Sequence, residues 1–309
     1  MESEFVRWLR TRLPASEWLG LGPGDDAALL RLGASGQAVV TTDLLVDSVH
    51  FRLGTDHPRR IGRKLLAVNL SDLAAMAAEP VAVVVSLCIP NSGGLALAKE
   101  LYEGLLPLAE EFQIAIAGGD TNCWDGPLVI DCTAIGRPTD RGLLRRDGGR
   151  AGDALLVTGA FGGSFLGKQF DFTPRIREAL HLNRDYQLHA GMDCSDGLAL
   201  DASRLAEASG CGLVLDLAAV PIAAAADQMA ASSQRTPLAH ALGDGEDFEL
   251  LLAVPADEAR RLLADQPLET PLTQVGEFVE ELGLFQREGA GRKPLAASGY
   301  LHDDTSHTQ

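Results

Sequence analysis

The sequence predicts an α/β protein of two domains, in which helices are layered on β-sheets. Its 309 residues are enough for two domains of ordinary size. Short runs rich in β-branched residues alternate with longer segments of helical periodicity, which favours mixed layers. The composition is that of a folded globular protein, with 46% hydrophobic and 22% charged residues.

The first half of the chain opens on MESEFVRWLRTRLP, which predicts a short amphipathic helix. Apolar and β-branched runs then predict strands over residues 37–42, 81–89, 114–117 and 128–135. Between these strands, apolar residues at helical spacing predict helices over residues 59–77 and 95–112.

The second half repeats the alternation. Strands are expected over residues 154–158, 212–215 and 248–254, and helices over residues 175–182, 198–208 and 256–265. The segment 136–152, GRPTDRGLLRRDGGRAG, is polar and rich in turn residues, so it is the predicted boundary. The expected domains are therefore residues 1–138 and 149–309.

Charge and cysteine content narrow the possible partners. The formal charge of −17 argues against nucleic acid or an anionic membrane surface, and it implies that bound phosphates need metal cations. The five cysteines form no CxxC pair, which favours a reducing compartment. No apolar run approaches 18 residues and no signal sequence opens the chain, so the cytoplasm is the expected location.

Acidic residues at predicted strand ends and beside glycines are the most informative feature. They occur in GPGDD, in VVTTD, in VNLSD, in AGGDT, in DCSDG and in GDGED. Each could be a helix cap or a turn residue when taken alone. Several carboxylates in apolar surroundings would repel one another unless cations neutralised them, and Mg²⁺ is the cation that prefers such oxygen ligands. No His/Cys cluster competes for zinc.

Glycines accompany these acids and allow backbone N–H groups to approach an anion closely. The segment VTGAFGGS could form such an anion-binding turn, or it could simply pack a strand against a helix. No segment matches a Walker A loop, a dinucleotide-binding fingerprint or the protein-kinase motifs.

Eight motifs in order resemble the thiamine-monophosphate kinase family, within the wider group of ATP-binding proteins related to aminoimidazole-ribonucleotide synthetase. They are GPGDDAALL, TTDLLVDSVHF, GRKLLAVNLSDLAAMAAEP, IAGGDT, GDALLVTGAFG, MDCSDGLALD, LGDGEDFELLL and SGYLHDD. The resemblance runs from about Leu21 to Asp303. The sequence departs from the family pattern after Asp120, where it reads Thr121-Asn122-Cys123-Trp124, and at Asp244.

The resemblance implies a two-domain synthetase-like fold whose N-terminal domains pair across a homodimer. It implies ATP-dependent phosphorylation of thiamine monophosphate to thiamine diphosphate, with several Mg²⁺ ions in a cleft between domains. The implied metal ligands are Asp26, Thr41, Thr42, Asp43, Asp72, Asp120, Asp193 and Asp196. The implied nucleotide contacts are Gly119, Asp120, Arg146, Ser195 and Tyr102, and the implied thiamine contacts are His50, Glu246 and Tyr300.

Purely structural roles are also open for several of these residues. His50 could be a solvated or capping histidine, Arg146 part of a basic turn, Tyr300 a core residue and Glu246 a turn cap. No general acid or base is assigned, because catalysis is expected from the metal cluster at Asp43, Asp72 and Asp120.

Two other functions are open on the same fold. One is a selenophosphate-synthetase-like enzyme, although the reactive Cys and Lys of that family have no counterpart before Gly22. The other is a non-catalytic, nucleotide-binding regulator, because a fold does not fix a function.

Overall fold

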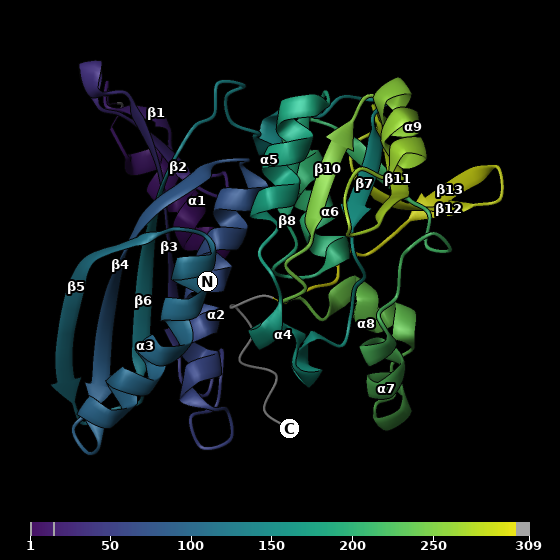
Figure 1. The fold of residues 1–309 in the computed structure, drawn as a ribbon. Coiled ribbons are helices and arrows are strands. Elements are labelled where there is room, and N and C mark those ends of the chain that lie inside the picture. The colour runs from purple at the N-terminus through teal and green to yellow at the C-terminus, as the bar shows by residue number, and fades with distance from the viewer. Residues whose placement is uncertain (1, 15, 301–309) are drawn as a thin grey trace.

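Two β-sheets organise the chain in the computed structural model, which describes residues 2–14 and 16–300 (Figure 1). The first sheet has the order β1-β2-β3-β6-β4-β5, and its neighbours are antiparallel except for the parallel pair β4 and β5. Its strands are β1 (Leu19–Leu21), β2 (Ala28–Arg31), β3 (Gln37–Val46), β4 (Glu79–Pro90), β5 (Ala115–Trp124) and β6 (Val129–Arg137).

Helices α2 (Pro58–Ala75) and α3 (Gly94–Glu111) belong to this first half, as does the N-terminal helix α1 (Glu2–Arg12). His57 caps α2 by accepting a 3.2 Å hydrogen bond from the Arg59 N–H, and Pro58 provides a favourable first helical residue. A Cβ on Gly62 would lie 1.9 Å from the Leu101 carbonyl oxygen. Only glycine therefore allows α2 and α3 to pack this closely.

The second sheet has the order β13-β12-β9-β11-β7-β10-β8 and pairs antiparallel except between β9 and β12. Its strands are β7 (Ala154–Thr158), β8 (Ala190–Asp193), β9 (Gly212–Leu215), β10 (Leu250–Val254), β11 (Leu272–Val279), β12 (Leu284–Glu288) and β13 (Gly291–Pro294). The helices of this half are α4 (Lys168–Asp171), α5 (Ile176–Asp185), α6 (Leu198–Ala208), α7 (Ala224–Ser232), α8 (Pro237–Gly243) and α9 (Ala256–Asp265).

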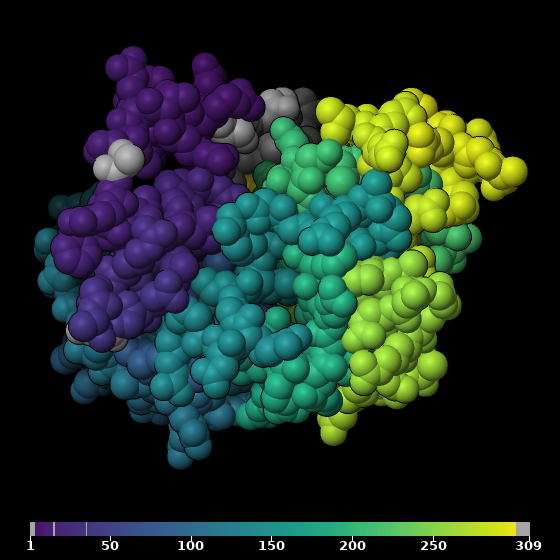
Figure 2. Space-filling model, turned by 90° about the horizontal axis from the view of Figure 1, so that it is seen from above, coloured from purple at the N-terminus to yellow at the C-terminus, as the bar shows by residue number. Residues whose placement is uncertain are grey.

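Both faces of the second sheet are buried, which explains why its central strands are apolar along their whole length. In β10, Leu250 and Leu252 pack into the core shared with α2, α5 and α9, whereas Leu251 packs with α6 and α8 on the opposite face. The shared core continues into the first half, because α2 contacts α4, α5 and β8. Figure 2 shows the purple N-terminal residues and the yellow C-terminal strands on opposite sides, with teal segments between them.

The structure confirms the mixed α/β fold. The strands at 154–158 and 212–215 and the helices at 198–208 and 256–265 lie where they were expected. The prediction for 114–117 was too short, because β5 continues through the two glycines to Trp124. Strands β1, β2, β8 and β11 to β13, and helices α4, α7 and α8, had not been predicted. Among the described helices, none combines the length and the hydropathy that a membrane crossing requires.

Candidate functional site

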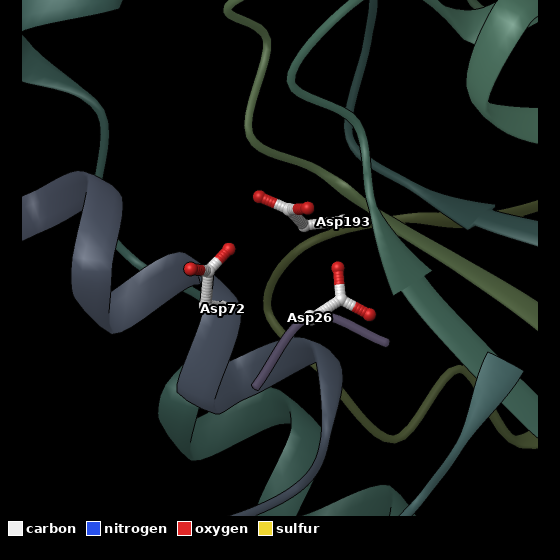
Figure 3. A group of neighbouring side chains, drawn as sticks. All are labelled: Asp26, Asp72 and Asp193. Atoms are coloured by element: carbon white, nitrogen blue, oxygen red, sulfur yellow. The ribbon is translucent and has the colours of Figure 1, made fainter. Parts of the chain in front are cut away.

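Three aspartate carboxylates converge at the junction of the two halves (Figure 3). Asp26 lies in the turn before β2, Asp72 on α2 and Asp193 at the end of β8. One oxygen from each of the three lies within 4.8 Å of the others. The fold therefore brings together carboxylates that are up to 167 residues apart in the sequence (193 − 26).

Hydroxyl groups and one guanidinium hold these carboxylates in place. Thr41 Oγ1 donates a 2.5 Å hydrogen bond to Asp72 Oδ2, and Ser71 Oγ donates one of 2.6 Å to Asp193 Oδ2. Arg146 binds both oxygens of Asp26, at 2.8 Å from Nε and 2.5 Å from Nη2.

The electrostatics of the cluster are unbalanced toward negative charge. Burial raises the pKa of Asp72 well above its ordinary value, and the neighbouring carboxylates of Asp43, Asp193 and Asp26 raise it further. Burial raises the pKa of Asp193 well above its ordinary value, and repulsion from Asp26 raises it further. The carboxylates are therefore costly to ionise unless a cation lies among them.

Asp43 on β3 adds a fourth buried carboxylate. Its pKa is raised to about 6 by burial and then by repulsion from Asp131. Its Oδ2 atom is buried, and no hydrogen-bond partner reaches it from residues 2–14 or 16–300. An orphaned carboxylate oxygen beside a three-carboxylate cluster fits a hard divalent cation such as Mg²⁺, which takes oxygen ligands. The donor set therefore fits the metal that the sequence predicts.

A cavity of about 1660 Å³ opens beside the cluster and is lined by residues from both halves. Eight of the predicted site residues line it: Thr42, Asp43, His50, Arg146, Ser195, Asp196, Glu246 and Tyr300. Backbone hydrogen bonds join the segments of the second half that line this cavity. The Glu246 N–H donates to the Ser195 carbonyl at 2.6 Å, and the Tyr300 N–H donates to the Asp196 carbonyl at 2.8 Å.

A hydrogen bond and an ion pair also hold His50 and Asp196 in place. His50 Nδ1 accepts a hydrogen bond of 3.1 Å from the Val46 N–H. Asp196 forms an ion pair with Arg204, which also donates to Asp201 Oδ1 at 2.9 Å. These contacts hold His50 at the end of β3 and Asp196 at the start of α6.

Three predicted nucleotide contacts lie elsewhere in the chain. Gly119 and Asp120 are exposed on β5, and Asp120 lines a separate pocket of about 190 Å³ with Asp131. Strands β6 and β4 separate β5 from β3 in the sheet. Tyr102 packs on the core from α3. Within one copy of the chain, Gly119, Asp120 and Tyr102 are thus not part of the cavity that eight of the predicted site residues line.

The segment VTGAFGGS does not present its amides to a ligand. The Gly162 N–H donates to Asp247 Oδ1 at 3.0 Å, and the Gly163 N–H donates to Asp244 Oδ2 at 3.1 Å. The interpretation as an anion-binding turn is therefore wrong, because the chain's own carboxylates use these donors. Asp244, a departure from the family pattern, has this structural role.

Sequence reasoning missed three residues that support the site. They are Lys64, which binds Glu246, Ser71, which binds Asp193, and Asp131, whose negative charge raises the pKa of Asp43. The helical period could have revealed Lys64, because residues 64, 68 and 72 share one face of a helix. A lysine on that face, beside Val68 and the predicted metal ligand Asp72, signals a buried partner.

Comparisons with known proteins follow the same division of the chain. The family model for AIR synthase related protein, N-terminal domain, matches residues 24–137, and the model for the C-terminal domain matches residues 143–285. The thiamine-monophosphate kinase of Rhodopirellula baltica is 40% identical over 99% of this chain and 98% of its own length. That of Caulobacter vibrioides is 34% identical over 90% of this chain and 84% of its own.

Solved structures are similar over nearly the full length. AaThiL complexed with AMPPCP and TMP has a TM-score of 0.84 and 26% identity, covering 97% of this chain and 96% of its own. A chain of the HypE–HypF complex has a TM-score of 0.75 at 17% identity, covering 94% and 99%, which shows a shared fold alone.

Proposed function

The chain belongs to the thiamine-monophosphate kinase family of AIR synthase related proteins, and we propose that it transfers the γ-phosphoryl group of ATP to thiamine monophosphate, forming thiamine diphosphate. The observation that carries this proposal is the buried carboxylate cluster beside a cavity that is lined from both halves. A relative solved with AMPPCP and TMP supports two phosphate-bearing substrates for such a site.

Asp26, Asp43, Asp72 and Asp193 would hold Mg²⁺ ions at the cluster, with Asp196 as a further ligand across the cavity. When bound, the ions supply the positive charge that cancels repulsion between the two phosphates and between the carboxylates. Thr41 and Ser71 keep two of these carboxylates oriented through their hydroxyl hydrogen bonds.

The other residues of the cavity bind and orient the substrates. Arg146 carries a planar guanidinium that suits a phosphate, and its present partner Asp26 would have to be shared or released. His50, Glu246 and Tyr300 also line the cavity and would receive the thiamine rings. The reaction needs alignment and charge cancellation more than covalent chemistry by the protein.

We also propose that two copies of the chain pair through the outer face of the first sheet. Residues on that face are exposed although they are apolar, with Leu44 at 55% and Trp124 at 42%. Asp120 is exposed on the same sheet, away from the carboxylate cluster of its own chain. A second copy seated on this face would bring its Gly119 and Asp120 to the rim of the cavity, where Thr42 lies.

We propose residues 138–149 as the domain boundary, because β6 ends at Arg137 and β7 begins at Ala154.

The decisive experiment for the activity is a coupled assay with ATP, Mg²⁺ and thiamine monophosphate. ADP and thiamine diphosphate should form together in equal amounts. ATP binding without any turnover dependent on thiamine monophosphate would instead support a regulator.

A further inference from the structure

Lys64 is among the largest fully buried side chains of the described residues, and its ammonium group lies where three segments meet. Nζ donates to the His50 carbonyl oxygen at 2.9 Å and to Gln169 Oε1 at 2.9 Å. It also contacts both carboxylate oxygens of Glu246, at 2.8 and 2.7 Å. A buried ammonium is tolerated only when its donors are used in this way.

The three segments come from both halves of the chain. His50 follows β3, Gln169 lies on α4, and Glu246 lies in the turn that precedes β10. Glu246 has a φ of 53°, in the left-handed region that a glutamate rarely adopts. Its conformation is fixed by the Lys64 ion pair on the side chain and by the Ser195 carbonyl on the backbone.

Lys64 cannot touch a ligand in the cavity, because its side chain is 0% exposed, whereas Glu246 is 20% exposed and lines the cavity with His50. Each member of the pair depends on the other for its charge. Burial lowers the pKa of Lys64 and Glu246 opposes that shift; burial raises the pKa of Glu246 and Lys64 opposes that shift.

We propose that Lys64 is a positioning residue for the part of the cavity that binds thiamine. It holds the backbone at His50 and the side chain of Glu246 in fixed positions, and its ion pair with Glu246 carries no net charge. Glu246 then serves as a hydrogen-bond acceptor for an uncharged donor, such as the amino group of the aminopyrimidine ring. It is not the counter-charge for the cationic thiazolium ring. This inference rests on the proposed function, because it concerns recognition of thiamine monophosphate.

Steady-state kinetics of Lys64→Met test the positioning role. KM for thiamine monophosphate should rise about tenfold or more, because hydrogen bonds to charged groups contribute roughly 1.5–3 kcal/mol, and ~1.4 kcal/mol is tenfold. KM for ATP should stay within about threefold, because Lys64 does not contact the carboxylate cluster. The exposed Lys99 on α3 provides the matched control, and Lys99→Met should leave both constants unchanged. Equal increases in both KM values would overturn the proposal.

A double-mutant cycle separates positioning from stability. Without substrates, Lys64→Met and Glu246→Gln should each lower the melting temperature by about 5 °C, and the double variant should recover part of that loss, because breaking a buried ion pair costs more than replacing it. The double variant should keep the raised KM for thiamine monophosphate. If the double variant instead recovered both the wild-type KM for thiamine monophosphate and part of the lost stability, the role of Lys64 would be only structural.

The cycle also separates this inference from the proposed function. Coupling between residues 64 and 246 in the melting temperatures, in a protein that does not turn over thiamine monophosphate, would leave the ion pair in place and refute the activity. Turnover in the wild-type protein without coupling, or without a selective change in KM, would refute the role of Lys64 and leave the activity standing.

Discussion

Thr42 and Asp43 are consecutive in β3, and their side chains lie on opposite faces of the first sheet. Thr42 Oγ1 is 3.0 Å from both Asp131 Oδ1 and Thr133 Oγ1 on the outer face of β6. Asp43 lies on the inner face with Thr41, which binds Asp72. Strand geometry therefore separates two adjacent predicted metal ligands.

This separation predicts a site that is completed by a second subunit. Asp120→Asn and Asp72→Asn homodimers should each be inactive, because one lacks the outer-face carboxylate and the other a cluster ligand. After subunit exchange, half of the dimers are mixed, and each mixed dimer holds one site with both aspartates intact. Turnover should therefore recover to about a quarter of the wild-type rate, given the two-fold symmetry expected of a homodimer.

The alternative arrangement gives a different result. If Asp120 served the cluster of its own chain, both sites of every mixed dimer would carry one defect, and no turnover would return. Sedimentation equilibrium on the same samples confirms that dimers are present.

Asp72 should be essential for metal-dependent turnover but not for folding. Asp72→Asn should lower kcat by orders of magnitude, because metal-ion stabilisation of transition-state charge is worth several kcal/mol. Its metal-free melting temperature should not fall, because Asp72 is buried beside like charges that disfavour its ionised form. The increase in melting temperature that Mg²⁺ produces should be smaller than in the wild-type protein.

The exposed Asp227 on α7 is the matched control for that variant, and Asp227→Asn should keep both turnover and the Mg²⁺ increment. An Asp72→Asn protein that keeps full activity after EDTA treatment and return of ATP would contradict the metal assignment.

Binding of Mg²⁺ should depend on pH because it competes with protons. The pKa of Asp43 in the folded, metal-free protein is about 6, raised from its ordinary value by burial and by Asp131. Its contribution to metal-free stability is thus largest below pH ~4 and is lost as the pH rises toward 6. Metal binding needs the ionised form, so Mg²⁺ affinity should increase between pH 5 and 7 with release of protons.

Isothermal titration calorimetry in two buffers of different ionisation enthalpy measures that release. At pH 5.5, the apparent binding enthalpy should depend on the buffer, and at pH 8 much less so. In Asp43→Asn, the proton release at pH 5.5 should decrease. A buffer-independent enthalpy at pH 5.5 in the wild-type protein would show that the carboxylates are already ionised before metal binds.

The fold was predictable where the pattern of apolar residues is local and strong. Helix α6 and strand β7 are continuous apolar or amphipathic segments, and their predicted bounds agree with the structure. Strand β8 is only Ala-Gly-Met-Asp and acquires its conformation from pairing with β10, so its own residues give little signal. Strand β5 is exposed, and its polar second half resembles a loop in sequence.

The site was predictable as a set of residue types but not as an arrangement in space. Asp26, Asp72 and Asp193 stand out as acids in apolar sequence, and the structure brings them together. Nothing local to Asp120 shows that it faces away from them, because that depends on the strand order of the whole sheet. The Lys64–Glu246 pair joins residues 182 positions apart, which no local pattern reveals.

The acceptor should be thiamine monophosphate rather than thiamine. The carboxylate cluster would hold cations that need a second phosphate as ligand, and a hydroxyl group would leave them under-coordinated. The ratio of kcat/KM for the two compounds measures this preference and should strongly favour the monophosphate. His50→Ala and Tyr300→Ala should raise KM for the thiamine compound more than KM for ATP, because both residues line the cavity and are the thiamine contacts that the family resemblance implies. Comparable kcat/KM values for thiamine and its monophosphate would refute the acceptor assignment.

Phosphoryl transfer should be direct, with neither a phosphoenzyme nor a general base. The acceptor is a phosphate monoester whose second pKa is near ~6, so its oxygen is already anionic at neutral pH. The histidine nearest to this role, His50, uses Nδ1 to accept the Val46 N–H. Its neutral ring therefore carries its proton on Nε2, where it donates and cannot accept.

His50→Gln, which keeps a hydrogen-bond donor but cannot act as a base, should thus leave kcat within about tenfold. At saturating Mg²⁺, kcat should rise as the acceptor phosphate ionises and then stay level, because no enzyme base titrates above that point. Rapid quench with γ-labelled ATP in the absence of thiamine monophosphate should leave no label on the protein. Stoichiometric labelling would establish a covalent intermediate, and a loss of several orders of magnitude in kcat for His50→Gln would make the histidine a catalytic group after all.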